Sequence, residues 1–426
     1  MKPTTELTDR RVMVVGLGVA GLPLAIRAAE VGYLVQGIDI DRDRIRLLRD
    51  GVSYVDDVSD KRLQDVVADG RFRARQAVGL DAEILSFDCA VITVPTPFAH
   101  GIPDRSRLTA AARLVGRNLS RGNTVIVEST SYPGTTEGLV ANAISEESGL
   151  YPGDDYYLGF SPERADHGNK VHNFVSTPKL VSGSDPGSLK RVKAFYDNLV
   201  DHTVPVSSPA VAEFAKVFES VFSQVNIALV NELAVVAHEF NIDIWEVIEA
   251  ANTKPHGFMK HTPGPGIGGH YLPVDPAYLS WLVNTDLGVP LRLSEMAQEI
   301  NDSMPAYVVH RAQNMLPQGL SGTKILILGA SYRPGTADIR EAPALEIIEL
   351  LRRKGAQVTI SDPYVQGWVA TPNLPAESVV SQAAEFSLVI VVTAHDEFDY
   401  DKIADTASLV LDCRRRMTPS ATVASL

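Results

Sequence analysis

Cysteine is scarce in this sequence, and neither long apolar runs nor an excess of basic residues is present. Only two cysteines occur among 426 residues, so a disulfide framework is not expected. No apolar run approaches the roughly 20 residues that a membrane-spanning helix needs, and the N-terminal stretch MKPTTELTDRR lacks the apolar core of a signal peptide. A net charge of −13 argues against nucleic acid and anionic membrane surfaces as partners. We therefore expect a globular, cytoplasmic protein.

The first part of the chain has the pattern of an α/β fold. A β-branched run at residues 12–15 is followed by GLGVAG, a helical stretch over 22–30 and a second strand over 34–40 that ends in acid. Strand-like runs at 89–94, 124–127 and 179–181 continue the alternation. The alternation predicts a doubly wound parallel sheet.

The middle and the end of the chain predict two further domains. Residues 211–240 contain no Gly and no Pro and show helical periodicity, which predicts a helix of about 45 Å, with a second helical region over 290–314. This segment is interpreted as a spacer and dimer core, although packing alone would explain it equally well. A strand at 324–328, the loop GASYRPGTAD, a helix over 344–354 and a strand ending at Asp362 then repeat the first unit in weakened form. We predict domains at 1–208, 209–315 and 316–426, the last Rossmann-like without a dinucleotide.

The glycine-rich turn after the first strand predicts a dinucleotide site. Gly16, Gly18 and Gly21 form GxGxxG between a strand and a helix, with Val19 and Ala20 inside the turn. Asp39 follows Gly21 by eighteen residues, where a carboxylate binds the adenosine ribose and repels a 2′-phosphate. NAD is therefore the expected cofactor, and a tight turn without a ligand is the alternative.

Five further motifs carry a resemblance to one family. They are VPTP (94–97), ESTSYPGTTE (128–137), FSPER (160–164), NIALVNEL (226–233) and PGPGIGGHYLPVDP (263–276). Together they resemble the UDP-glucose/GDP-mannose dehydrogenase family, and most of all its branch that oxidises C6 of UDP-N-acetylhexosamines. The resemblance implies two successive NAD-dependent oxidations, from primary alcohol through aldehyde to carboxylate. In that family the glycine run ends in GGHC, whose cysteine captures the aldehyde; here that position is Tyr271.

The resemblance also implies catalytic residues. The stretch AEFAKVFES matches the family pattern whose lysine stabilises the developing alkoxide, which assigns that role to Lys216. Without the family, a solvated lysine in an ion-pair face would be the better interpretation. Ser220 stands where the family has an asparagine that helps to bind the reacting oxygen. Asp275 matches a family aspartate that holds a water near the lysine. The alternative interpretation of Asp275 is a loop carboxylate that caps the next helix.

Other predicted contacts come from the same motifs. Glu163 matches a glutamate that positions water for thioester hydrolysis. If no thioester forms, that role lapses and Glu163 is left only to orient the substrate. Thr130 belongs to the same water and proton network, and Thr96 and Thr130 are expected at the cofactor. Arg164 is expected at the substrate.

The remaining substrate contacts are expected from the glycine loop and the C-terminal domain. They are Phe258, Lys260, Gly266, Gly268, Gly269 and Arg340, in addition to Glu163, Lys216 and Tyr271. The resemblance implies that Arg340 reaches the active site of the neighbouring subunit in a homodimer, where its planar fork suits a phosphate. His256 replaces a family phenylalanine. His167, His261 and His270 lack metal-ligand spacing, so no metal is expected.

The tyrosine at position 271 limits the expected reaction. A phenol is a weak carbonyl nucleophile, whereas a thiol is partly ionised near neutral pH. Cys89 and Cys413 are interpreted as structural. The leading hypothesis is one two-electron oxidation of a nucleotide sugar, to an aldehyde or, for a C6-extended sugar such as the octoses of lincosamide-type antibiotic pathways, to a ketone. The alternatives are full oxidation to the acid, a transient-oxidation epimerase and an inactive binding protein.

Overall fold

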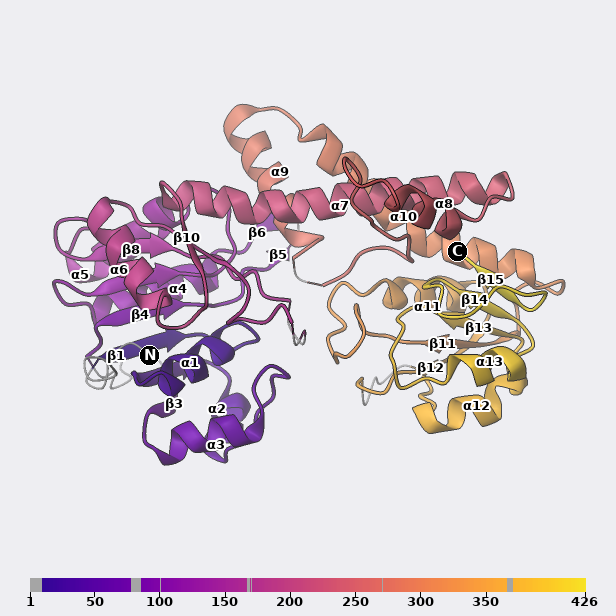
Figure 1. Ribbon diagram of the computed structural model, residues 1–426, viewed down its shortest axis with the longest axis horizontal. Coiled ribbons are helices and arrows are strands. Elements are labelled where there is room, and N and C mark those ends of the chain that lie inside the picture. Colours follow the sequence, from indigo (N-terminus) through magenta and orange to yellow (C-terminus); the bar gives the residue numbers. More distant parts are fainter. Residues whose placement is uncertain are drawn as a thin grey trace. The chain divides into compact units, whose positions relative to one another are not determined.

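The computed structural model describes residues 10–77, 86–99, 101–166, 169, 171–269, 271–365 and 371–426 (Figure 1). The chain forms two compact units, Met1–Glu219 and Ser220–Leu426. Each unit is built on one large parallel sheet with helices on both faces, which confirms the predicted α/β class. Each unit is described by itself below.

The first unit is built on a six-stranded parallel sheet in the order β3-β2-β1-β4-β7-β8. β1 and β2 agree with the predicted strands to within one residue. The six strands are β1 (Arg11–Val15), β2 (Leu34–Asp39), β3 (Phe72–Gln76), β4 (Cys89–Ile92), β7 (Thr124–Val127) and β8 (Tyr157–Phe160). Two short pairs lie outside it, the antiparallel β5 (Phe98–Ala99) and β6 (Ile102–Pro103), and the parallel β9 (Lys179–Val181) and β10 (Thr203–Pro205).

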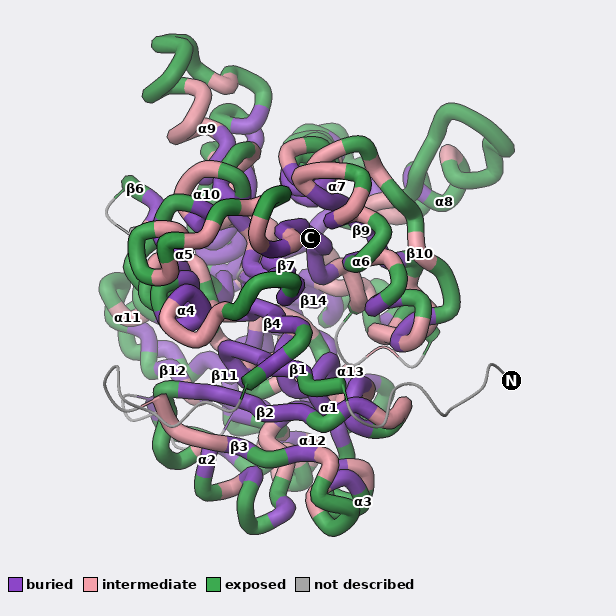
Figure 2. Tube along the Cα trace, turned by 90° about the vertical axis from the view of Figure 1, so that its left-hand side faces the viewer, coloured by how far each residue is buried: buried purple, intermediate pink, exposed green. Residues whose placement is uncertain are grey.

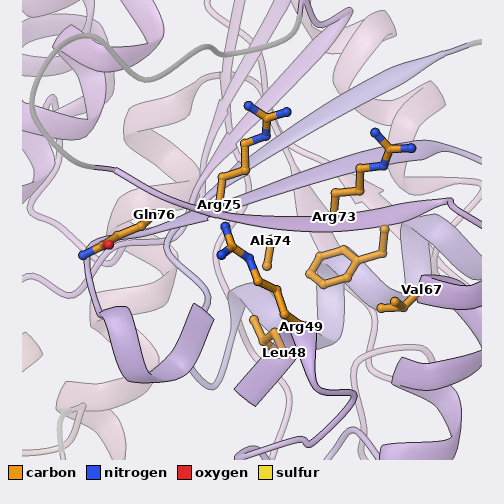
Figure 3. Close-up of a pocket in the computed structure, with 8 residues that line it drawn as sticks. Leu48, Arg49, Val67, Arg73, Ala74, Arg75 and Gln76 are labelled. Atoms are coloured by element: carbon orange, nitrogen blue, oxygen red, sulfur yellow. The ribbon is translucent and has the colours of Figure 1, made fainter. Parts of the chain in front are cut away.

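Strand β3 forms one edge of this sheet and lines a cavity of about 600 Å³. Arg49 of the neighbouring helix and Arg73 and Arg75 of the strand line it together with apolar side chains (Figure 3). Charged side chains on an edge strand hinder pairing with another chain. None of the predicted site residues lines this cavity.

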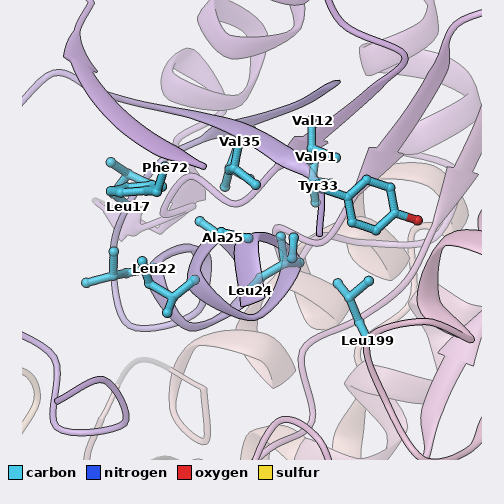
Figure 4. Packing of buried hydrophobic residues seen from close by; sticks show 14 of the residues in the cluster. Val12, Leu17, Leu22, Leu24, Ala25, Tyr33, Val35, Phe72, Val91 and Leu199 are labelled. Carbon is cyan, nitrogen blue, oxygen red and sulfur yellow. The ribbon is translucent and has the colours of Figure 1, made fainter. Parts of the chain in front are cut away.

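Helices cover both faces of the first sheet because successive β1 side chains alternate between two cores. Val12 and Val14 pack with α1 (Gly21–Glu30) and Phe72, as part of the cluster drawn in Figure 4. Met13 and Val15 pack on the opposite face. The central strands β1, β4 and β7 are therefore almost entirely buried (Figure 2). The other helices are α2 (Arg42–Arg49), α3 (Asp60–Ala68), α4 (Ser106–Arg117), α5 (Ala141–Ser148) and α6 (Pro186–Tyr196), with a π-helical turn at Thr136–Val140.

Helix α7 (Pro209–Glu239) is the long helix that the sequence predicts. By length and composition alone it is apolar enough to cross a membrane, which our expectation of no membrane-length segment did not anticipate. The core helix of a soluble protein meets the same test, so a single such helix is weak support for a membrane span. The polar side chains of Glu213, Gln224 and Asn231 are buried along α7, as in a helix packed within protein.

The second unit adds helices to a five-stranded parallel sheet in the order β12-β11-β13-β14-β15. The sequence predicted β11, α11, β12 and most of α10, but not α8 and α9. The strands are β11 (Lys324–Leu328), β12 (Gln357–Ser361), β13 (Leu388–Val391), β14 (Val410–Asp412) and β15 (Val423–Ser425). The helices are α8 (Ile244–Asn252), α9 (Val274–Leu287), α10 (Arg292–Met315), α11 (Pro343–Arg353), α12 (Val379–Gln382) and α13 (Tyr400–Thr406), with 3₁₀ turns at Ala376–Ser378 and Ala383–Glu385.

Candidate active site

The glycine turn between β1 and α1 has the conformation that a dinucleotide site requires. Gly16 has φ +97°, and a Cβ on it would lie 2.8 Å from the carbonyl oxygen of Thr93. A Cβ on Gly21 would overlap the Gly16 carbonyl oxygen. Gly18 differs, because a Cβ there would meet no atom within 4 Å. Two glycines thus close the turn, and the third leaves its outer side open for a pyrophosphate. Val19 and Ala20, beside it, are half-buried.

Asp39 lies at the end of β2, as predicted, and it shapes the same turn. Its Oδ2 accepts a hydrogen bond of 2.8 Å from Leu17 N, and its Oδ1 accepts one of 2.9 Å from Asp41 N. Arg44 Nη1 lies 3.6 Å from Asp39 Oδ2, and Tyr54 Oη donates to Leu17 O at 2.6 Å. These residues fit a bound NAD. Arg44 and Tyr54 were not predicted, because no local pattern marks them.

The loops after β4 and β7 meet through the two predicted threonines. Thr96 Oγ1 donates a hydrogen bond of 2.6 Å to Thr130 O. Both residues follow strands that end at the same edge as β1, the edge where ligands bind in open parallel sheets.

Glu163 is buried and held by several donors. Its Oε1 accepts hydrogen bonds from Arg164 N at 2.8 Å and Ala165 N at 2.6 Å. Its Oε2 lies 3.1 Å from Lys179 Nζ, which is also 3.1 Å from Glu128 Oε1. Burial by itself lowers the pKa of Lys179, but the two carboxylates outweigh burial and raise that pKa. Glu163 therefore anchors the loop after β8, and no sequence pattern indicated Lys179 as its partner.

Arg164 is engaged within the first unit. Its Nε and Nη2 donate to the two carboxylate oxygens of Glu219 at 3.2 and 2.6 Å, and Nη1 donates to Pro178 O at 2.8 Å. The guanidinium thus ties the loop after β8 to α7, three residues beyond Lys216.

Lys216 is buried rather than part of a solvated ion-pair face, with 8% of its surface exposed. Glu213, one turn earlier, is also buried and accepts hydrogen bonds from Gly134 N at 2.6 Å and from Thr136 N and Oγ1 at 2.9 and 2.7 Å. Burial raises the pKa of Glu213. The carboxylate therefore fixes the first turns of α7 against the loop after β7.

Ser220, one turn beyond Lys216 on α7, contacts Asp275 directly. Ser220 Oγ donates a hydrogen bond of 2.7 Å to Asp275 Oδ2, and the two residues are 5% and 1% exposed. Asp275 lies in the first turn of α9, where a carboxylate is favoured by the helix dipole. The structure thus brings together two of the predicted catalytic residues.

Tyr271 begins the turn that leads into α9. Its carbonyl oxygen accepts hydrogen bonds from Asp275 N at 2.8 Å and Val274 N at 3.2 Å, and its side chain is partly buried. The preceding glycine loop is packed closely within the second unit: a Cβ on Gly266 would lie 3.1 Å from Asn301 O, and one on Gly268 would lie 2.8 Å from Tyr332 Cβ. Gly269 N donates to Arg340 O at 3.0 Å. Tyr332 was not predicted as a support of this loop.

The other predicted substrate residues are more exposed. Phe258 is 40% exposed, and Lys260 forms an ion pair with Glu249. Arg340 is half exposed and donates to Asp338 from Nε and Nη2. The hydrogen bonds to Asp338 raise the pKa of Arg340, so it stays a cation.

No group of three or more His, Cys, Asp or Glu with metal-binding geometry occurs among the described residues. His261 Nδ1 lies 3.1 Å from Met259 O. His167 and His270 lie outside the part of the chain that the structure describes.

The fold, the glycine turn and Asp39 define the class of protein as one with a dinucleotide-binding α/β domain. The chain belongs to the UDP-glucose/GDP-mannose dehydrogenase family: residues 10–200 match the model of its NAD binding domain, 210–303 its central domain and 326–419 its UDP binding domain. It is an NAD-dependent oxidoreductase that acts on a CH–OH group of a nucleotide sugar.

Relatives match over nearly the whole chain. A UDP-N-acetyl-D-mannosamine dehydrogenase from Pyrococcus horikoshii is 35% identical over 392 residues, which cover 91% of this chain and 90% of that protein. A UDP-N-acetyl-D-glucosamine 6-dehydrogenase from Pseudomonas aeruginosa is 34% identical, with 92% of each chain covered. Among solved structures, a UDP-D-ManNAc dehydrogenase from P. horikoshii has a TM-score of 0.87 at 31% identity, covering 97% of this chain and 98% of that one. A UDP-glucose dehydrogenase from Pyrobaculum islandicum has a TM-score of 0.86 at 26% identity, with both chains fully covered.

Proposed function

We propose that this chain oxidises the C6 carbinol of a UDP-linked sugar by two electrons and then releases the carbonyl product. The relatives that are named for UDP-N-acetylhexosamines and the match to a UDP binding domain support the choice of nucleotide. We also propose that the enzyme acts in the cytoplasm, where NAD and nucleotide sugars occur together.

The single observation that carries the proposal is the lack of an accessible thiol. Tyr271 stands at the position of the family cysteine, and the sequence has only two cysteines, both buried. Burial raises the pKa of Cys89 far above its ordinary value and that of Cys413 to about 12. Without a thiolate, no thiohemiacetal forms on the aldehyde carbon, so the chain offers no covalent tetrahedral adduct from which a second hydride could leave.

Each residue of the site has a separate role in this oxidation. NAD, when bound at the glycine turn, accepts the hydride of the carbinol C–H bond. Lys216 stabilises the negative charge that develops on the sugar oxygen as its proton leaves. Asp275 and Ser220 hold the polar surroundings of that oxygen through their buried hydrogen bond. One carbinol and one NAD⁺ thus give one carbonyl, one NADH and one proton.

A ketone product suits the missing thiol best, because a ketone carbon has no hydrogen left to give up as hydride. The proposed substrate is therefore a C6-extended nucleotide sugar with a secondary alcohol, such as an octose of a lincosamide-type antibiotic pathway. A ketone at that carbon would be a suitable substrate for a later transamination.

We further propose that the protein is a homodimer, with Arg340 reaching the neighbouring active site. Apolar side chains are at least 39% exposed along α7, at spacings of three, four or seven residues, which gives one continuous stripe. They are Val211, Phe214, Phe218, Phe222, Leu229, Leu233, Val236 and Phe240. A second copy of the chain would cover this stripe.

The test is a panel of nucleotide sugars given to the wild-type chain and to Tyr271→Cys. The panel contains UDP-N-acetylhexosamines, UDP-glucose, GDP-mannose and a C6-extended UDP-sugar, with the product identified by mass. The proposal predicts a carbonyl product from the wild-type chain, and an acid from Tyr271→Cys with a C6 primary alcohol. An unchanged product from Tyr271→Cys would count against the missing thiol as the cause. NAD binding without oxidation of any sugar would indicate a binding protein instead.

A further inference from the structure

The two parallel sheets carry the same turn after their first strands. Gly16 follows β1 with φ +97°, and Gly329 follows β11 with φ +84°. A Cβ on either glycine would come too close to the carbonyl oxygen of a threonine after the adjacent strand, Thr93 in one unit and Thr393 in the other. The turns are therefore equivalent in backbone and in packing.

The acid at the end of the second strand is equivalent as well. Asp39 Oδ2 accepts from the residue after Gly16, and Asp362 Oδ2 accepts from the residue after Gly329, Ala330 N, at 2.7 Å. In a dinucleotide-binding domain this carboxylate binds the hydroxyls of the adenosine ribose. In the second unit Asp362 is instead paired with a side chain of the same chain.

That side chain is His395, two residues after Thr393. Its Nε2 lies 3.0 Å from Asp362 Oδ2 and 3.2 Å from Ser331 Oγ, and both His395 and Ser331 are fully buried. Gly335 N donates to His395 Nδ1 at 3.2 Å, so the imidazole proton is assigned to Nε2. The His395 Nε2–H therefore donates to the Asp362 carboxylate, and Nδ1 accepts a hydrogen bond from the backbone of the loop.

We propose that His395 takes the position at Asp362 that a ribose takes at Asp39, and that it positions the loop of residues 329–340 for nucleotide binding. His395 is a positioning residue in this account. The role of Arg340 in nucleotide binding rests on the proposed function. The ordering of the 329–340 loop by His395 does not depend on that function.

The loop that His395 holds supports the glycine loop before α9. Tyr332 N donates to Asp338 O at 2.9 Å, and Asp338 in turn binds the Arg340 guanidinium. Arg340 O accepts from Gly269 N, and the Tyr332 ring lies within about 3 Å of where Gly269 would carry a Cβ. A displacement of the 329–340 loop would therefore move both Arg340 and the glycine loop.

The sequence of the turn agrees with this assignment. Where the first unit has Gly18 and Gly21, the second unit has Ser331 and Pro334. Ser331, at the position of Gly18, carries a side chain where close approach of a pyrophosphate requires a glycine. The second unit has kept the acid and the turn, and it uses them to hold a loop rather than a dinucleotide.

The experiment separates the two hydrogen bonds of His395 in the full-length chain. His395→Asn keeps an acceptor near the position of Nδ1, His395→Gln keeps a donor near that of Nε2, and His395→Ala removes both. His310→Gln, on exposed α10 surface where His310 contacts only Asn314 among the described hydrogen bonds, is the matched control. Hydrogen exchange of the segment 329–341 and titrations with UDP and with NAD are measured for each.

We expect faster exchange in the segment and weaker UDP binding, by about tenfold for His395→Ala and less for the other two, because the loss of a buried hydrogen bond releases the loop. NAD affinity stays at the wild-type value. Wild-type exchange and UDP affinity in all three variants would overturn the proposal, as would equal losses of UDP and NAD binding. If the wild-type chain failed to bind UDP, the proposed nucleotide would be wrong, whereas hydrogen exchange would still decide the role of His395.

Discussion

Ser220 donates a hydrogen bond of 2.7 Å to Asp275, and both residues are almost completely buried. The two are 55 residues apart in the chain, on α7 and in the first turn of α9. The family asparagine at position 220 would present a longer side chain with two donors and an acceptor. Serine at position 220 still holds the Asp275 carboxylate in place. This contact favours the view that the chain retains the first of the family's two oxidations, from alcohol to carbonyl.

Replacing Ser220 tests this relationship. Ser220→Ala removes a donor to a buried carboxylate, so we expect a loss of about 1–2 kcal/mol in the free energy of unfolding and a fall in turnover of about tenfold. Urea denaturation and initial rates measure the two effects. Ser303→Ala is the control, because Ser303 is exposed and its hydroxyl donates to Ile300 O within α10. Wild-type turnover in Ser220→Ala would show that the hydrogen bond has no part in catalysis.

A matched pair of glycine variants tests the cofactor site. Gly18→Ala adds a Cβ into open space, so we expect normal folding and NAD binding weaker by about tenfold or more, because that Cβ faces the pyrophosphate position. Gly21→Ala adds a Cβ that overlaps the backbone, so we expect the protein to lose stability. Thermal unfolding and NAD titration distinguish the two. Equal stability losses in both variants would contradict the assignment of Gly18 to the ligand.

Lys179 provides a third prediction. It lies between Glu128 and Glu163 and is 2% exposed, so Lys179→Met leaves two buried carboxylates without their shared cation. We expect a loss of about 3–5 kcal/mol in the free energy of unfolding. The double variant Lys179→Met/Glu128→Gln should recover part of that loss, which denaturant unfolding measures. A loss no larger than that of Lys193→Met, an exposed lysine paired with Asp197, would contradict the structure.

Acid stability depends on Asp362. Burial by itself raises the pKa of this carboxyl, but the hydrogen bonds from His395 and from backbone N–H groups outweigh burial and lower the pKa to about 2. A lowered folded pKa stabilises the fold above the ordinary value of about 3.9, and this contribution, up to about 2 kcal/mol, is lost as the pH falls from about 4 to about 2. Asp362→Asn should flatten this part of the stability curve. An identical pH dependence in wild type and variant would contradict the pKa shift.

The sequence predicted the local features well, and it predicted contacts between distant residues poorly. The glycine turn, Asp39 and the long helix follow from spacing within short segments. His395 lies 33 residues from Asp362 and 64 from Ser331, so no local periodicity indicates their contact. Lys179 was expected only as part of a strand, although its side chain joins two motif glutamates. Asp275 was expected in a loop or as a cap, and it lies within α9.

The most direct measurement of the central claim is the ratio of NADH formed to nucleotide sugar consumed by the wild-type chain, followed to completion. With no thiolate able to retain the first carbonyl product, the ratio should be one, and the product should react with a carbonyl reagent. A ratio of two together with a carboxylate product would contradict the account, because it would show that the second oxidation proceeds with a tyrosine at position 271.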